Sequence, residues 1–429
     1  MPFALRHSTG AQLLIDVVFY AAIVGAAIMA FSIGGNGAAS SMASAYGAKA
    51  LTMRQAVFVA AVANFVGAVF LGGAVTATVA GGIIDATDIP DANQLAVGML
   101  SALLAAGLFV LAATIMGLPV ATSQAIVGAI AGFGVLVAGW GVVYWDAMIV
   151  IIVAWVITPF VAAAMAWALV RFIRFSLRTE SHRTKRIVEV VPIWMASVGM
   201  IVMIFVVEEM FPDTTVSLAT IGLLLIAIST IVYVLGYRLM VDRHFVRRDD
   251  PEETIQESFK RLQIFTSGYL SLAHGANDVA NAIGPVFAIY LLARQGVLSP
   301  DVEVPLWILL IGGIGLAAGV AGIAARVIRT VGEGITELEN VRGFSADFTT
   351  ASMLMVASHF GLPVSAAQTA VGAVAGTGLA HGKADLNARV LLRILASWLL
   401  TVPVAAVLSI AIYLLFEAIL LPATASVPA

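Results

Sequence analysis

The chain has no cysteine and very little charge. Of its 429 residues, 11% are charged and 61% are hydrophobic, whereas an ordinary soluble domain carries roughly 25% charged residues. The absence of cysteine excludes a disulfide framework, a thiolate metal site and a cysteine nucleophile. The net charge of −3 and the lack of a basic tract interleaved with aromatic residues exclude nucleic acid as a partner.

Long apolar runs take the place of the missing charge. Several approach or exceed the ~20 residues that a helix needs to cross a bilayer; they cover residues 14–33, 143–170, 193–207, 218–235, 306–325 and 391–421. The first run lacks a small-residue cleavage signature and is long enough to span, so we predict a retained helix rather than a signal peptide. The sequence thus predicts an all-α polytopic protein, multi-pass in the lipid bilayer of the cell (plasma or inner) membrane.

Two polar motifs occur twice in this apolar chain. Gly275–Asn281 reads Gly-Ala-Asn-Asp-Val-Ala-Asn, and Gly34–Ser40, 241 residues earlier, reads Gly-Gly-Asn-Gly-Ala-Ala-Ser. Gly117–Gly132 matches Gly361–Gly376 at an offset of 244 residues. Offsets this similar indicate that a segment of about 160 residues was duplicated.

The duplication divides the chain into two repeats and a connector. Trp155 and Trp398, 243 residues apart, form a further matched pair. We expect a first transmembrane repeat over residues 1–170, a connector with two membrane helices over 171–261, and a second repeat over 262–429. Basic stretches at both ends of the connector predict that these ends are cytoplasmic. An odd number of crossings per repeat makes the repeats inverted copies and an even number makes them parallel; counting does not decide between the two.

The first motif pair predicts a cation site, because an ionisable residue within a bilayer marks an ion or substrate path by default. Glycine ahead of Asn277 and Asp278 predicts a break in the helix that adds free backbone carbonyls to the side-chain oxygens. Such oxygens suit a hard cation such as sodium, and a carboxylate shielded from water can instead carry a proton. Alternatively, Asp278 caps a helix that begins near Val279. His274 could relay protons or be a neutral, hydrogen-bonded structural residue.

The second motif pair predicts an anion site. Pro119 and Pro363 break a helix, and the polar residues that follow each break open a new one: Thr122, Ser123 and Gln124, and Ser365 and Gln368. Backbone N–H groups and side-chain donors at a helix N-terminus bind anions; the alternative is that these residues only bridge helices. Gly/Pro-interrupted apolar segments at corresponding places in two halves indicate a transport site near the membrane midplane.

Together these residues resemble the inorganic phosphate transporter family, the PiT group of sodium- or proton-coupled phosphate symporters, called solute carrier family 20 in animals. The resemblance covers both repeats. It rests, in chain order, on Gly47–Thr52, Gly117–Gln124, Gly275–Asn281, Gly334–Leu338 followed by Arg342–Phe344, and Gly361–Gln368. It implies about 10–12 membrane segments in two inverted repeats with re-entrant or broken helices, and phosphate held between the repeats.

Carried over residue by residue, the resemblance implies two groups of site residues. The cation site would contain Asn277, Asp278 and Asn281, with Asn36 and Ser40 as first-repeat counterparts, and sodium is the metal that would bind there. The anion would contact Thr122, Ser123 and Ser365, with Gln124 and Gln368 beside them. The chain departs from the family at Gly37 and Ser40, where the family has aspartate and asparagine, and in both hairpins, which lack the usual Pro-Val-Ser-Thr-Thr-His.

These features predict a secondary active transporter that imports a tetrahedral oxyanion by alternating access, with sodium or a proton as co-ion and no cofactor. Phosphate is favoured over sulfate because Asp278 is retained and most of the family carries phosphate. A sulfate permease of the same fold and an anion channel are the alternatives. An enzyme is not expected, since no serine–histidine–aspartate set, paired-histidine motif or aspartate pair is found. Assembly into a homo-oligomer is left open by the sequence.

Overall fold

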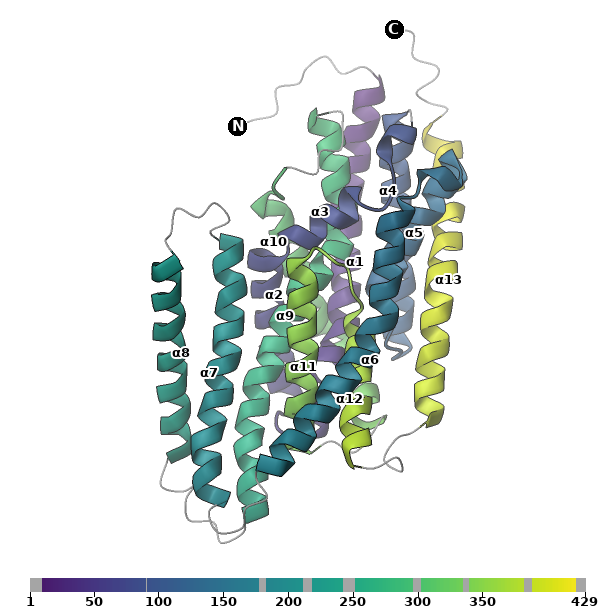
Figure 1. The fold of residues 1–429 in the computed structure, drawn as a ribbon. Helices are drawn as coiled ribbons and strands as arrows, with labels where there is room; N and C mark the ends of the chain where they lie inside the picture. Colours follow the sequence, from purple (N-terminus) through teal and green to yellow (C-terminus); the bar gives the residue numbers. More distant parts are fainter. Residues whose placement is uncertain are drawn as a thin grey trace.

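The structure, a computed structural model, describes residues 10–89, 91–176, 183–210, 218–241, 251–295, 302–334, 339–381 and 388–421. Over these ranges the chain forms thirteen α-helices, two short 3-10 helices (Ala86–Asp88 and Trp140–Val142), no strand, and one isolated antiparallel bridge between Ile84 and Val143. The long helices stand side by side in one bundle (Figure 1). The predicted all-α fold is confirmed.

The helices of the first repeat and connector are α1 (Gly10–Gly47), α2 (Met53–Leu71), α3 (Gly73–Gly81), α4 (Ala92–Ile115), α5 (Thr122–Ala138), α6 (Trp145–Ser176), α7 (Arg183–Met210) and α8 (Leu218–Val241). Those of the second repeat are α9 (Pro251–Gln295), α10 (Leu306–Gly334), α11 (Asn340–His359), α12 (Ala366–His381) and α13 (Ala388–Leu420). The expected boundaries at 170/171 and 261/262 fall inside α6 and α9, and the division into repeats and connector stays a prediction.

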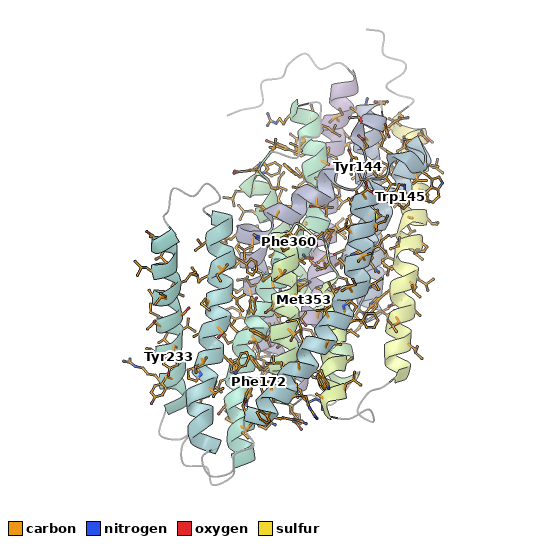
Figure 2. All side chains as sticks on the ribbon, viewed as in Figure 1. Tyr144, Trp145, Phe172, Tyr233, Met353 and Phe360 are labelled. Carbon is orange, nitrogen blue, oxygen red and sulfur yellow. The ribbon has the colours of Figure 1, made fainter. Side chains whose placement is uncertain are left out.

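Seven described helices are long and apolar enough to cross a membrane by length and composition: α1, α2, α4, α6, α9, α10 and α13. Shorter apolar stretches lie in α5, α7 and α8. In the most apolar stretch of α9, 89% of residues are buried, against 28% in α6 and 22% in α13. Large apolar side chains such as Phe160 and Leu399 are exposed, and so is Phe172 on α6 (Figure 2). Helix α9 is therefore central, and the outer helices present a surface suited to lipid.

The matched helices α6 and α13 run in opposite directions. Figure 2 places Trp145 near the top of the molecule and Phe172 near the bottom, so α6 descends. Helix α13, which carries the matching Trp398, ends at the top, close to the C terminus (Figure 1). Helices α7 and α8 pack against each other at one edge. The basic stretches that predict the cytoplasmic side cover residues 171–186 and 238–261, and within them 177–182 and 242–250 lie outside the described residues.

The predicted helix breaks at Gly34–Ser40 and Gly275–Asn281 are wrong, because α1 and α9 run unbroken through both motifs. The glycines serve close packing instead. A Cβ built on Gly34 would overlap the backbone carbonyl of Leu316 in α10, and one built on Gly275 would overlap that of Asn64 in α2. Small residues of this kind let membrane helices approach closely. Because Asp278 lies inside α9, it does not cap a helix.

The breaks predicted at the two Gly-Leu-Pro segments are confirmed. Helix α4 ends at Ile115 before α5 begins at Thr122, and α11 ends at His359 before α12 begins at Ala366. Gly117 and Gly361 have φ values of 73° and 65°, a left-handed conformation that glycine adopts without steric penalty. Each segment is thus the tip of a helical hairpin, α4–α5 or α11–α12.

The close approach at the first motif pair makes a stability prediction. Gly34→Ala and Gly275→Ala should each destabilise the protein by about 1–3 kcal/mol, because the added methyl group meets backbone of the neighbouring helix rather than a movable side chain. Thermal unfolding of the detergent-solubilised protein measures this. Gly81→Ala is the matched control, since a Cβ there meets nothing within 4 Å. Equal midpoints for all three variants would contradict the packing role.

Candidate ion and anion site

All ten predicted site residues are buried, with exposed fractions between 0% and 9%. They come from four places in the chain: the middle of α1, the middle of α9, and the tips of the two hairpins. Hydrogen bonds join these four places to one another. The ten are Asn36, Ser40, Thr122, Ser123, Gln124, Asn277, Asp278, Asn281, Ser365 and Gln368.

Asn36 of α1 holds the tip of the first hairpin. Its Nδ2 donates to Thr114 Oγ1 at 3.1 Å and to the carbonyl of Leu118 at 2.9 Å. Its Oδ1 accepts from the backbone N–H of Val120 at 3.1 Å. A break in a helix frees backbone donors and acceptors that lipid cannot satisfy, and this one amide satisfies two of them.

Asn277 of α9 makes the two corresponding donor contacts to the second hairpin, while its Oδ1 has no hydrogen-bond partner among the described residues. Its Nδ2 donates to Ser358 Oγ at 3.0 Å and to the carbonyl of Leu362 at 3.2 Å. Ser358 and Leu362 are the duplicates of Thr114 and Leu118, 244 residues further along. The duplication has therefore preserved a set of contacts as well as a sequence pattern.

The two tips also contact each other. Ser123 Oγ at the start of α5 donates to the carbonyl of Val364 at 2.8 Å and accepts from Asn281 Nδ2 at 3.2 Å. Trp155 Nε1 of α6 donates to the carbonyl of Pro363 at 2.9 Å. The indole N–H of Trp398, the duplicate of Trp155, is buried and has no hydrogen-bond partner among the described residues. The two halves thus differ at this contact.

Asp278 links the motif on α9 to the first hairpin. Its Oδ2 accepts from Thr122 Oγ1 at 2.7 Å and lies 3.3 Å from His274 Nε2. Its Oδ1 has no hydrogen-bond partner among the described residues. One carboxylate oxygen is therefore held by the protein while the other is available to a ligand.

Buried oxygens without partners gather in this region. Within the described part of the chain they include Oδ1 of Asn277, Asp278 and Asn281, and Oε1 of Gln124 and Gln368. Each buried acceptor without a partner costs about 1–3 kcal/mol, so a ligand that bonded to several of them would be stabilised here. Carboxylate and amide oxygens are the ligands that a hard cation such as sodium prefers.

The predicted anion contacts are engaged within the protein in this structure. Thr122 and Ser123 donate their hydroxyl hydrogens to Asp278 and to the carbonyl of Val364. Ser365 Oγ accepts from the backbone N–H of Gln368 at 3.2 Å. An anion that enters between the tips must take over donors that now serve these acceptors. Ser40 lies one turn beyond Asn36 on α1 and is buried.

Sequence reasoning missed a second buried carboxylate, Asp347 on α11. It accepts hydrogen bonds from Ser267 Oγ of α9, at 2.5 Å, and from Ser44 Oγ of α1. The signal was present in the sequence, because an ionisable residue within a bilayer is a functional candidate by default. Asp347 follows Arg342–Phe344, a stretch used only for the family resemblance, whose companion residues 335–338 lie outside the described part of the structure.

Long apolar helices around two helical hairpins, whose tips are held by a matched pair of asparagines, define a polytopic helical protein with a buried polar site. Comparison with known proteins identifies the group. Residues 33–409 match the model of the Phosphate transporter family. The chain therefore belongs to that family, whose members are transporters and not enzymes.

Individual relatives agree over nearly the whole length. A predicted phosphate permease of Pyrococcus horikoshii is 42% identical over 382 residues, covering 89% of this chain and 93% of the relative. Inorganic phosphate transporter 2-1, chloroplastic, of Arabidopsis thaliana is 33% identical over 441 residues, covering 96% of this chain and 74% of the relative. A solved structure, the sodium-dependent phosphate transporter, matches with a TM-score of 0.89 and 38% identity over 94% of this chain and 100% of that one.

The tryptophan pair provides an internally controlled prediction. Trp155→Phe should destabilise the second hairpin tip by about 1–3 kcal/mol, because it leaves the buried carbonyl of Pro363 without its donor. Trp398→Phe removes an indole N–H that has no described partner, so it should cost clearly less. Thermal unfolding and hydrogen exchange at residues 361–368 measure both effects. Equal losses in the two variants would show that the Trp155 hydrogen bond is not what holds the tip.

Proposed function

We propose that this protein imports inorganic phosphate across the cell (plasma or inner) membrane together with sodium or protons. The observation that carries the proposal is a set of buried oxygens on α9 without hydrogen-bond partners in the described part of the chain, next to two hairpin tips that carry hydroxyl and amide donors. The three oxygens are Asn277 Oδ1, Asp278 Oδ1 and Asn281 Oδ1. A cation on these oxygens and an anion at the tips would lie side by side and stabilise each other. The sodium dependence of the matching solved transporter favours sodium as the cation.

The anion would be held by the hairpin tips. Thr122, Ser123 and Ser365 supply hydroxyls, Gln124 and Gln368 supply amides, and the first turns of α5 and α12 supply backbone N–H groups that have no intrahelical acceptor. A helix N-terminus binds an oxyanion without a buried cationic side chain. This arrangement suits a substrate whose charge is balanced by a co-transported cation.

Coupling between the two ligands can act through Thr122. Its hydroxyl donates to Asp278 Oδ2, so the carboxylate that would bind the cation also holds a predicted anion donor. A cation on Asp278 weakens the hold of the carboxylate on that hydrogen, and Thr122 can then turn to the anion. Each ligand thereby raises the affinity for the other, the reciprocity that thermodynamic linkage requires.

Alternating access would exchange the roles of two inverted halves. The opposite directions of α6 and α13 support inversion. The tips support a closed state, because Ser123 bonds to the backbone of the opposite hairpin and Trp155 bonds to the carbonyl of Pro363, while Trp398 makes no such bond among the described residues. In a state with the two halves exchanged, Trp398 would bond to the tip of the hairpin that it faces, and Trp155 would not.

The purified protein in liposomes tests this function. We expect saturable phosphate uptake against its concentration gradient when an inward sodium or proton gradient is imposed. Uptake that is indifferent to both gradients would defeat the symport proposal, and uptake that never exceeds equilibrium would identify an anion channel. Sulfate binding stronger than phosphate binding, measured with and without sodium, would reassign the protein as a sulfate permease.

Asp278→Asn is the sharpest substitution for the cation site. It keeps the shape of the side chain and the acceptor for Thr122 but removes the charge, so gradient-driven phosphate uptake should fall by at least about tenfold, the effect of losing 1.4 kcal/mol of cation binding. The folded fraction and the unfolding midpoint should change little. Asp146→Asn, on an exposed aspartate in the first turn of α6, is the control and should transport normally. Wild-type coupling in Asp278→Asn would leave this aspartate with a structural role only.

A further inference from the structure

Gly37 stands where the duplication calls for a second carboxylate. It is the counterpart of Asp278, at the same offset of 241 residues that relates Asn36 to Asn277. The polypeptide backbone of the two motifs is equivalent, since both lie inside unbroken helices and both asparagines hold a hairpin tip. The difference at Gly37 is therefore confined to the side chain and to whatever occupies its place.

The imidazole of His274 occupies that place. A Cβ built on Gly37 would overlap His274 Nε2 and Cε1, well inside van der Waals contact. Gly37 and His274 belong to different repeats and to different helices, α1 and α9. The ring thus crosses from the second repeat into the position where a first-repeat carboxylate would begin.

One ring nitrogen of His274 is held by a hydrogen bond, and the other lies near a carboxylate without a hydrogen-bond partner among the described residues. Its Nδ1 forms a 2.5 Å hydrogen bond with Asn64 Oδ1 of α2. Asn64 is itself oriented, because its Nδ2 donates to the carbonyl of Ala60 at 2.8 Å, which leaves Oδ1 as the acceptor for an Nδ1–H donor. On the other side His274 Nε2 lies 3.3 Å from Asp278 Oδ2. His274 has no exposed surface.

We propose that His274 fills the first-repeat cation site and limits the protein to one cation at the duplicated motif. The proposal rests on the proposed function and specifies how many cations the same site couples to each anion. His274 acts as a positioning residue: it takes the volume of the missing carboxylate and lies against Asp278 Oδ2, leaving Oδ1 for the single cation.

The arrangement is not reciprocal between the repeats. The counterpart of His274 in the first repeat is Ile33, a buried apolar residue that offers neither ring nitrogen nor hydrogen bond. The two repeats thus differ at two corresponding positions. Gly37 corresponds to Asp278, and Ile33 corresponds to His274. Restoring a second cation site should require changes at both Gly37 and His274.

A double-mutant cycle tests whether the ring fills the site. Gly37→Ala should lower the unfolding midpoint, because its methyl group meets a ring that Asn64 holds in place. His274→Ala should relieve that loss, so that the double variant is more stable than the sum of the two single effects predicts. Additive effects of Gly37→Ala and His274→Ala would overturn the proposal. This measurement needs only folded protein, and it stands whether or not transport is coupled.

The second test counts cations. The sodium dependence of phosphate binding should be about first order in the wild type and about second order in Gly37→Asp/His274→Ala, because the steepness of binding cannot exceed the number of linked sites. Gly37→Ala/His274→Ala, which opens the space without adding a carboxylate, is the matched control and should remain about first order. A second-order sodium dependence in the wild type would overturn the proposal. So would a first-order dependence in the folded Gly37→Asp/His274→Ala variant.

Failure of the proposed function gives a different result. If wild-type phosphate uptake ignores sodium and proton gradients, symport is wrong, and the stability cycle still decides whether His274 occupies the site. If the wild type is proton-coupled, the order of the cation dependence of phosphate binding is measured against proton concentration in the wild type. In Gly37→Asp/His274→Ala it is measured against sodium concentration. Should the aspartate variant fail to fold, the alanine cycle decides the proposal alone.

Discussion

The hydrogen bonds from two asparagine side chains to two breaks in helical backbone are the contacts on which this structure depends. A break within a bilayer leaves peptide groups that lipid cannot satisfy. Asn36 and Asn277 meet that demand at Leu118 and Leu362, from helices that are themselves unbroken. Rigid helices thereby hold the irregular segments at a fixed depth, and the polar groups of both tips converge on one another.

Because α1 and α9 are continuous, their backbone carbonyls are used within the helix and are not available to an ion. In the proposed cation site the available oxygens therefore belong to side chains, foremost Asp278 and its neighbours Asn277 and Asn281. The identity of each side chain then matters more than it would in a site built from backbone. In the proposed site, glycine at position 37 supplies no ligand where its counterpart Asp278 would supply one, and the neighbouring ring of His274 occupies the space.

Much of the fold follows from the sequence, because lipid imposes long apolar helices and the duplication is written in the residues. The hairpin breaks were predictable since Pro119, Pro363 and their preceding glycines permit few other conformations. The path of α9 through Gly275 was not, because the same glycine can break a helix or allow close packing, and only the presence of Asn64 beside it decides. The candidate site residues were proposed from their polarity, and their role in binding stays a prediction, whereas their partners, such as Thr114 and Ser358, depend on which helices come together.

The asymmetry between Trp155 and Trp398 has a consequence for how the two halves can evolve. The two tryptophans occupy matching positions in the duplicated sequence, yet in this structure they meet different neighbours. Under the proposed alternating access, the two tryptophans form their hydrogen bonds in different states, so a substitution that leaves this structure unchanged would still prevent transport. The two halves are therefore no longer interchangeable in sequence.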